Sequence, residues 1–185
     1  MAHFAKLELE IDPSGFTSNT LLVVKNIFVV ADDIPTSDGP LGENDMHIDG
    51  ETWCKNFFGG ENWKQTSYTS KFRGRYAQIG GYYDVAADEF IEKRMYASWS
   101  LNDNNEWVPP IDYPSSTTYG DPSLDPQPQY TVYWDEPNLR FLGYDIDPQT
   151  QLEGNEFVWD PDSSSWSATG RVYSESPYAT ANQGG

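Results

Sequence analysis

Apolar and polar residues alternate along residues 4–11, which predicts a strand with one buried face. The apolar residues share one side of such a strand, namely Ala5, Leu7, Leu9 and Ile11. Residues 21–30 are apolar and β-branched on both sides, a pattern typical of a more central strand. A turn sequence at residues 12–15 separates the two stretches. We therefore expect an N-terminal hairpin with a long loop.

Residues 49–58 form the best helix candidate in the chain. Asp49 can cap the N-terminus, and two glycines at 59–60 can end the helix. Trp53 and Phe57 are four residues apart and would form one apolar face. The predicted helix is short, so packing must stabilise it.

Two less regular stretches flank this helix. Residues 32–50 are rich in Asp, Gly and Pro and show little periodicity, which predicts an extended surface loop. After the helix, Trp63, Thr66 and Tyr68 favour a strand, and the later glycines favour turns.

A weak repeat beginning at residue 83 predicts four β-hairpins. In each, an aromatic residue precedes an acidic or polar turn, and a second aromatic follows seven or eight residues later. The pairs are Tyr83 and Phe90, Trp99 and Trp107, Trp134 and Phe141, and Trp159 and Trp166. Cross-strand aromatic pairs contribute roughly 0.2–1 kcal/mol each, and one hairpin alone is marginal in water. The hairpins must therefore pack on one another, on the N-terminal part or on a neighbouring subunit.

These elements predict a mainly β fold of hairpins and small antiparallel sheets with one short α-helix. We expect an N-terminal α+β domain at residues 1–95 and aromatic β-hairpin modules at 96–174. Six prolines in residues 109–129 predict a semi-extended linker between hairpins. Residues 175–185 are expected to form a flexible tail.

The net charge of −18 is unevenly distributed along the chain. Residues 1–80 hold 7 basic and 11 acidic side chains, whereas residues 81–185 hold 4 and 18. The acidic part should repel nucleic acid and anionic membranes, so neither is expected as a partner. The acidity serves either solubility or an acidic face for a basic partner.

The N-terminus and the apolar stretches predict a protein that is soluble and synthesised in the host cytoplasm. The first six residues lack the basic and apolar regions of a signal peptide. Residues 21–31 form the longest apolar stretch and are too short to cross a bilayer. The single cysteine, Cys54, allows no intrachain disulfide and is consistent with a reducing compartment.

No catalytic motif, metal site or cofactor site is expected. The sequence contains no nucleophile elbow, P-loop, dinucleotide fingerprint or zinc-protease motif. His3 and His47 are interpreted as solvated or capping residues. Residues 45–50 mimic the start of a calcium loop, but Asn56 stands where the closing Glu is needed. With 29 acidic residues, a pair of carboxylates alone does not indicate a glycosidase.

One window combines cations with aromatic residues and contains no acidic residue. Lys64, Lys71, Arg73 and Arg75 alternate there with Trp63, Tyr68, Phe72 and Tyr76. Either these residues pair with acids of the same chain, or they form a docking patch for an acidic surface, such as that of a neighbouring copy. The complete set of candidate interface residues comprises Trp63, Lys64, Tyr68, Phe72, Arg73, Arg75, Tyr76, Trp99, Trp107, Trp134, Trp159 and Trp166.

Several stretches together resemble a family of small, mostly uncharacterised proteins of tailed phages that infect marine bacteria and cyanobacteria. They are the N-terminal MAHFAKL at 1–7, WKQTSY at 63–68, FRGRYAQIG at 72–80, Tyr83-Asp84, Asp88-Glu89-Phe90, and residues 97–107. The resemblance covers roughly residues 1–110. It implies phage origin and a place in the virion, and it brings no catalytic residues with it. The loop at 32–50 and the chain beyond about 110 depart from the pattern.

These observations favour a structural component of a phage virion, associated with the capsid, neck or tail. Such a protein would bind other virion proteins through protein–protein contacts and occur in multiple symmetric copies. One alternative is a carbohydrate- or receptor-binding module of a tail fibre, in which Trp134 or Trp159 stacks on a sugar. A second alternative is a small non-virion protein made during infection.

Overall fold

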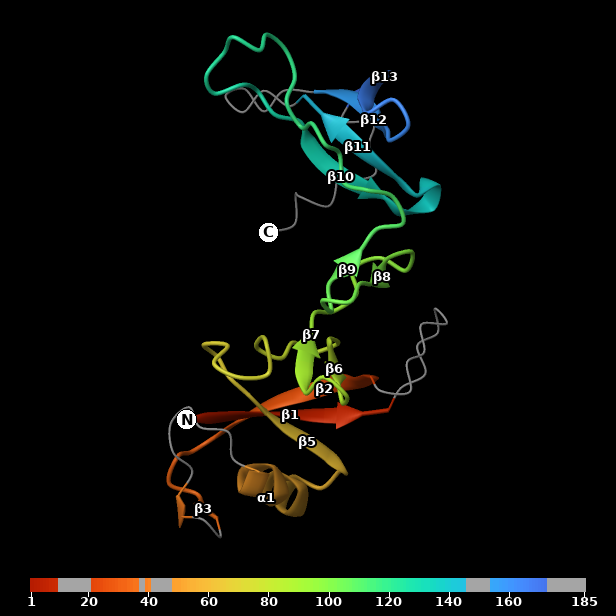
Figure 1. Ribbon diagram of the computed structural model, residues 1–185. Helices are drawn as coiled ribbons and strands as arrows, with labels where there is room; N and C mark the ends of the chain where they lie inside the picture. Colours follow the sequence, from red (N-terminus) through yellow and green to blue (C-terminus); the bar gives the residue numbers. More distant parts are fainter. Residues whose placement is uncertain (10–20, 37–38, 41–47, 146–153, 173–185) are drawn as a thin grey trace. The chain divides into compact units, whose positions relative to one another are not determined.

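The computed structural model of the protein describes residues 1–9, 21–36, 39–40, 48–145 and 154–172 (Figure 1). It is mainly β, with 42% strand and 9% helix, and its sheets are antiparallel, which confirms the predicted fold class. The elements are β1 Ala2–Glu8, β2 Leu21–Val30, β3 Pro35–Thr36, β4 Gly39–Pro40, α1 Ile48–Phe58, β5 Asn62–Thr66, β6 Tyr82–Asp84, β7 Glu89–Ile91, β8 Ser100–Leu101, β9 Trp107–Val108, β10 Thr131–Asp135, the 3-10 helix η1 Glu136–Asn138, β11 Arg140–Tyr144, β12 Asn155–Asp160 and β13 Ser165–Val172.

The chain forms two compact units. Unit 1 comprises residues 1–97 and 101–107, and unit 2 comprises residues 98–100 and 108–185. No helix among the described residues is long and apolar enough to span a membrane.

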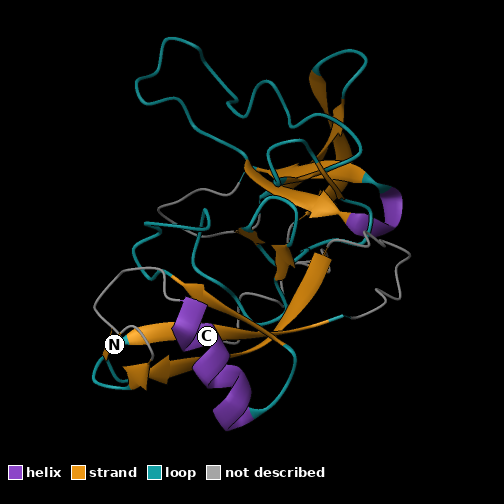
Figure 2. Cartoon of the chain, turned by 60° about the horizontal axis from the view of Figure 1, so that its bottom comes forward, coloured by secondary structure: helices purple, strands orange, loops and turns teal. Residues whose placement is uncertain are grey.

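Unit 1 is built on a five-stranded sheet in the order β5-β1-β2-β6-β7. The predicted N-terminal hairpin is present, because β1 pairs with β2 along its length. However, β1 is buried on both faces. Phe4 packs on one side with Cys54 of α1 and Trp63, and Leu7 packs on the other with Tyr83. The one-sided burial expected from the alternation is therefore wrong for β1, since α1 covers the second face (Figure 2).

The single α-helix lies where it was predicted and begins one residue earlier, at Ile48. Asp49 consequently lies in the first turn and not at the cap. Gly59 ends the helix with φ of +73°, and its N–H donates to Lys55 O at 3.0 Å. Such a left-handed residue after the last turn is the conformation that glycine adopts most easily. In the preceding loop, β3 and β4 form a small pair. Residues 45–47 of the calcium-like sequence, including His47, lie outside the described residues, and residues 48–50 form the start of α1.

All four predicted hairpins are present, as β6–β7, β8–β9, β10–β11 and β12–β13. In three of them the predicted aromatic residues lie directly opposite each other, as Tyr83 with Phe90, Trp134 with Phe141, and Trp159 with Trp166. Their ring centroids are 5.1, 4.9 and 5.2 Å apart. In the fourth hairpin, β8–β9, the two predicted residues pack on other rings. The ring centroid of Trp99 lies 6.3 Å from that of Trp134, and the centroid of Trp107 lies 5.7 Å from that of Tyr82.

Three of the four hairpin tips use the expected side-chain turns, whereas the β10–β11 tip is formed by η1, which has no side-chain cap hydrogen bond. Asp84 Oδ1 accepts hydrogen bonds from the N–H groups of residues 86 and 87. Asn102 Oδ1 accepts from residues 104 and 106, and Asp160 Oδ1 accepts from residue 162. Each carboxyl or amide oxygen therefore replaces a backbone acceptor in its turn.

Unit 2 is a four-stranded sheet in the order β10-β11-β12-β13, and aromatic rings line one of its faces. The first part of the proline-rich stretch 109–129 lies against this face. Tyr113 packs edge-on against Phe141 at 5.1 Å, and Trp166 donates its indole N–H to Ser116 O at 2.7 Å. Tyr130 then packs on Trp166 at 4.9 Å. The stretch predicted to be a linker is thus a packed part of unit 2, and the predicted tail at 175–185 lies outside the described residues.

Gly143 of β11 makes this packing testable. A Cβ atom added there would lie 2.8 Å from Trp166 Cζ3, so the indole would have to move. We expect Gly143→Ala to lower the free energy of unfolding by about 1–3 kcal/mol, measured by urea denaturation. In a Trp166→Leu background the same change should cost clearly less. An equal cost in both backgrounds would contradict the contact.

Candidate functional site

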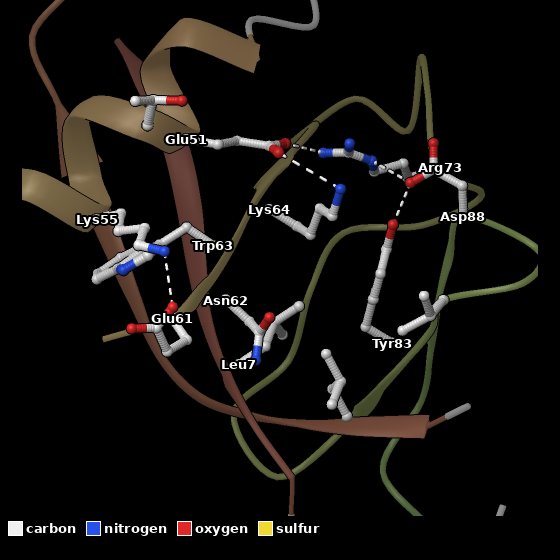
Figure 3. Close-up of a pocket in the computed structure, with 13 residues that line it drawn as sticks. Leu7, Glu51, Lys55, Glu61, Asn62, Trp63, Lys64, Arg73, Tyr83 and Asp88 are labelled. Carbon is white, nitrogen blue, oxygen red and sulfur yellow. Dashed lines mark hydrogen bonds and ion pairs between the residues drawn. The ribbon is translucent and has the colours of Figure 1, made fainter. Parts of the chain in front are cut away.

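A pocket of about 590 Å³ opens in unit 1 between α1, β5 and the segment from Arg73 to Asp88 (Figure 3). Leu7 and Leu22 of the sheet supply apolar walls, and Trp63 borders the same space. The size and the mixed lining are typical of ligand pockets, so its charged groups need to be accounted for one by one.

Glu51 of α1 binds the free side of the edge strand β5. Its Oε1 accepts from the backbone N–H of Gln65 at 2.9 Å and from Arg73 Nη1 at 2.6 Å. Its Oε2 lies 3.5 Å from Lys64 Nζ. The carboxylate therefore fixes α1 to β5 and neutralises two cations.

Arg73 connects the two edge strands of the sheet. Its Nη1 donates to Gln65 O of β5 at 2.8 Å, and its own carbonyl accepts from Phe90 N of β7 at 3.1 Å. Its backbone is left-handed, with φ of +57°. Exposed strand edges invite pairing with other chains, and natural proteins block them with charged groups. Glu51 and Arg73 together block the Gln65 peptide in this way.

Asp88 and Tyr83 complete the network. Asp88 Oδ1 accepts from Arg73 Nε at 2.8 Å and from the Tyr83 hydroxyl. Burial alone raises the pKa of Asp88, but the hydrogen bonds from Tyr83 and Arg73 and the charge of Arg73 outweigh it, so the pKa lies below its ordinary 3.8. Burial and the hydrogen bond to Asp88 raise the pKa of Tyr83 well above 10.

The pocket therefore holds charges that are matched within the chain. Nearby, burial and the neighbouring Glu51 raise the pKa of the Cys54 thiol to about 12, so the thiol stays protonated at neutral pH. Among the described residues, no group of three or more His, Cys, Asp or Glu side chains is placed to hold a metal ion. The direct effect of these paired charges is to stabilise the fold of unit 1.

The residues of the predicted cationic window do not form one surface. Arg73 is only 8% exposed and Trp63 is buried, so neither is available to a partner. Lys64 lines the pocket, and Arg75 pairs with Glu92 at 2.8 Å. The structure thus favours the alternative in which these cations pair with acids of the same chain.

The aromatic members of that window are partly accessible. Tyr68 is 77% exposed, and its ring centroid lies 5.5 Å from that of Tyr76. The Tyr76 hydroxyl is hydrogen-bonded to His3 Nδ1 at 2.7 Å, and Phe72 is half-buried. These rings form a small cluster of their own at the start of β1.

The predicted aromatic interface residues of the hairpins are mostly covered. Trp134 is 3% and Trp159 is 5% exposed, which removes both from the open surface. Trp99, Trp107 and Trp166 are half-buried. For Trp166 the cover is provided by the proline-rich stretch, whose role the sequence interpretation missed, because the indole N–H donates to Ser116 O.

A different aromatic surface, which the sequence interpretation missed, lies at the C-terminal end of α1. We call it the helix-end patch, and it consists of Phe28, Trp53, Phe57 and Phe58. Trp53 and Phe57 stack at 4.7 Å, and Phe58 packs on Phe28 at 4.6 Å. Phe57 nevertheless remains 68% exposed.

The patch exists because α1 turns an unexpected side toward the sheet. The predicted apolar face, Trp53 with Phe57, was expected to pack inward, and this is wrong for Phe57. Glu51 and Cys54 are buried instead, because Glu51 is held by Gln65 and Arg73. Three aromatic residues within six helical positions were the available sequence signal.

Comparison of the chain with protein-family models, curated proteins and solved structures finds no match in any of the three.

Variants of Arg73 and Arg75 allow the buried ion pair with Glu51 to be compared with the more exposed pair with Glu92. We expect Arg73→Met to lower the free energy of unfolding by about 3–5 kcal/mol, because the buried Glu51 and the half-exposed Asp88 both lose their buried cationic partner. The matched control Arg75→Met breaks the solvent-exposed pair with Glu92 and should cost at most about 1 kcal/mol. Chemical denaturation measures both, and similar costs for the two variants would refute this account.

Acid should weaken the fold through Asp88. A carboxyl whose pKa is depressed in the folded state stabilises the protein above its unfolded pKa and loses that contribution as pH falls through the folded value. The free energy of unfolding should therefore fall as the pH drops below 3.8. In Asp88→Asn this part of the decline should be shallower. Parallel curves for the two proteins would argue against the linkage.

Proposed function

We propose that this protein is a structural component of a tailed-phage particle and binds neighbouring particle proteins through the helix-end patch. The observation that carries the proposal is the exposure of Phe57 on a helix that the Glu51–Arg73 pair holds in place. The resemblance of residues 1–110 to phage proteins supplies the particle context.

The patch has the properties of a contact surface. Aromatic residues are enriched at the centres of protein interfaces, where they bury large areas at little entropic cost. Phe57 and Phe58 are already oriented by their neighbours, with ring centroids 4.9 Å apart. Covering one exposed Phe ring contributes about 1.5–3 kcal/mol.

Charge defines the chemistry of the partner. The chain carries a net charge of −18, and several of its cations are already paired internally, such as Lys55 with Glu61 and Arg140 with Asp135. Its field therefore attracts a basic surface and repels further copies of itself. The proposed partner is a virion protein with an apolar recess and a basic rim, and its symmetric lattice or ring sets the number of copies bound.

Mass spectrometry of purified particles tests the particle role. We expect peptides of this protein at a fixed ratio to the major capsid or tail protein, retained after a high-density gradient. Their absence from the particles, with presence in infected-cell lysate, would favour the non-virion alternative and refute the proposal.

Phage carrying variant genes test the patch. Phe57→Ser with Phe58→Ser should reduce the copies per particle at least about tenfold, the factor given by 1.4 kcal/mol of lost contact energy. Ile79→Ser is the matched control, because Ile79 is an exposed apolar residue of the same unit outside the patch. Circular dichroism of the purified variants verifies the fold. Normal incorporation of the folded double variant would contradict this role of the patch.

A further inference from the structure

A second pocket, of about 350 Å³, lies within unit 2 and differs from the first in its polar groups. It is formed by the tip of the β12–β13 hairpin and the beginning of the proline-rich stretch. Its lining residues are Pro110, Ile111, Asp112, Tyr113, Ser115, Trp159, Pro161 and Ser164. This volume falls within the range of small-molecule sites.

The apolar lining of this pocket includes two aromatic rings, and each of them packs on a further ring of unit 2. Trp159 is nearly covered and is fixed against Trp166 at 5.2 Å. Tyr113 rests edge-on against Phe141 at 5.1 Å with an interplanar angle of 70°. It is still 59% exposed, so much of its ring remains accessible. Tyr113 is therefore an ordered, accessible aromatic platform.

The polar groups of this pocket differ from the charged groups of the first pocket, which are paired with one another. The described part of the chain offers no hydrogen-bond or ion-pair partner to the side chains of Asp112, Ser115 and Ser164. A carboxylate accepts hydrogen bonds at both oxygens, and each hydroxyl donates one and accepts others. These groups border the same space as the Tyr113 ring.

An accessible aromatic ring beside carboxylate and hydroxyl groups that have no partner within the described residues matches the chemistry of a neutral sugar. The C–H face of a pyranose ring packs on an aromatic ring, and its hydroxyls donate to a carboxylate and exchange hydrogen bonds with serines. Residues 108–185 contain 12 acidic and 2 basic side chains, so the field of unit 2 disfavours phosphorylated, sulfated or sialylated ligands.

We infer that this pocket binds one ring of a neutral glycan, with Tyr113 as the stacking platform and Asp112 as the main hydrogen-bond acceptor. This assignment moves the expected sugar contact from Trp134 or Trp159, which are both buried, to Tyr113 in the proline-rich stretch. It is independent of the helix-end patch, which belongs to unit 1.

Binding of the full-length protein to an array of neutral and anionic oligosaccharides tests the inference, followed by titration calorimetry on the best neutral glycan. We expect binding to one or more neutral glycans and none to their sialylated or sulfated counterparts. Saturation-transfer NMR should show transfer to the C–H protons of a single sugar ring. Absence of binding to every neutral glycan, or a preference for anionic glycans, would overturn the inference.

Variants then locate the site. Tyr113→Ala should weaken binding at least about tenfold, and Tyr113→Phe should preserve it, because stacking needs only the ring. Asp112→Asn changes an exposed side chain with no partner in the described chain, so it should weaken binding without affecting the fold. Tyr68→Ala removes an exposed tyrosine ring from unit 1 and serves as the control. Unchanged affinity in both Tyr113→Ala and Asp112→Asn would place the sugar elsewhere and refute the assignment.

Discussion

The structure of unit 1 depends on the ion pair between Glu51 and Arg73. A five-stranded open sheet has two free edges, and a helix on one face must be fixed in rotation as well as in position. The pair meets both requirements, because Glu51 anchors α1 to the backbone of Gln65 while Arg73 contacts β5 and β7. The same contact turns Phe57 outward, so an internal electrostatic constraint determines which residues the surface presents.

Unit 2 solves the same physical problem with apolar contacts. Its sheet has aromatic rings opposite one another on neighbouring strands, and such a face is unstable if it remains wet. Tyr113 of the proline-rich stretch and the adjoining Tyr130 cover it, and the Trp166 indole fixes the cover through Ser116. The cover leaves Tyr113 half in solvent, which is the origin of the second pocket. The helix-end patch of unit 1 and the second pocket in unit 2 therefore both result from the way each unit covers its core.

The features that could be predicted from sequence are those encoded within about ten residues. The hairpins follow from turn residues such as Asp160 and from aromatic pairs such as Trp159 and Trp166, which are close in the chain. The end of α1 follows from Gly59. The orientation of α1 could not be predicted, because it depends on Arg73, which is 22 residues from Glu51. The covering role of the proline-rich stretch depends on a contact between residues 116 and 166, which are 50 positions apart. Composition suggested a linker there because residues 109–129 contain six prolines and only two tyrosines, Tyr113 and Tyr119.

The order of the cover and the sheet along the chain has a consequence during biosynthesis. Residues 108–130 leave the ribosome before β10 to β13, so the covering segment already exists when the first hairpin closes. Each aromatic pair can therefore be covered as soon as it forms, so the nascent chain need not expose a complete and uncovered aromatic sheet. A circularly permuted chain that placed the cover last would lose this order of events.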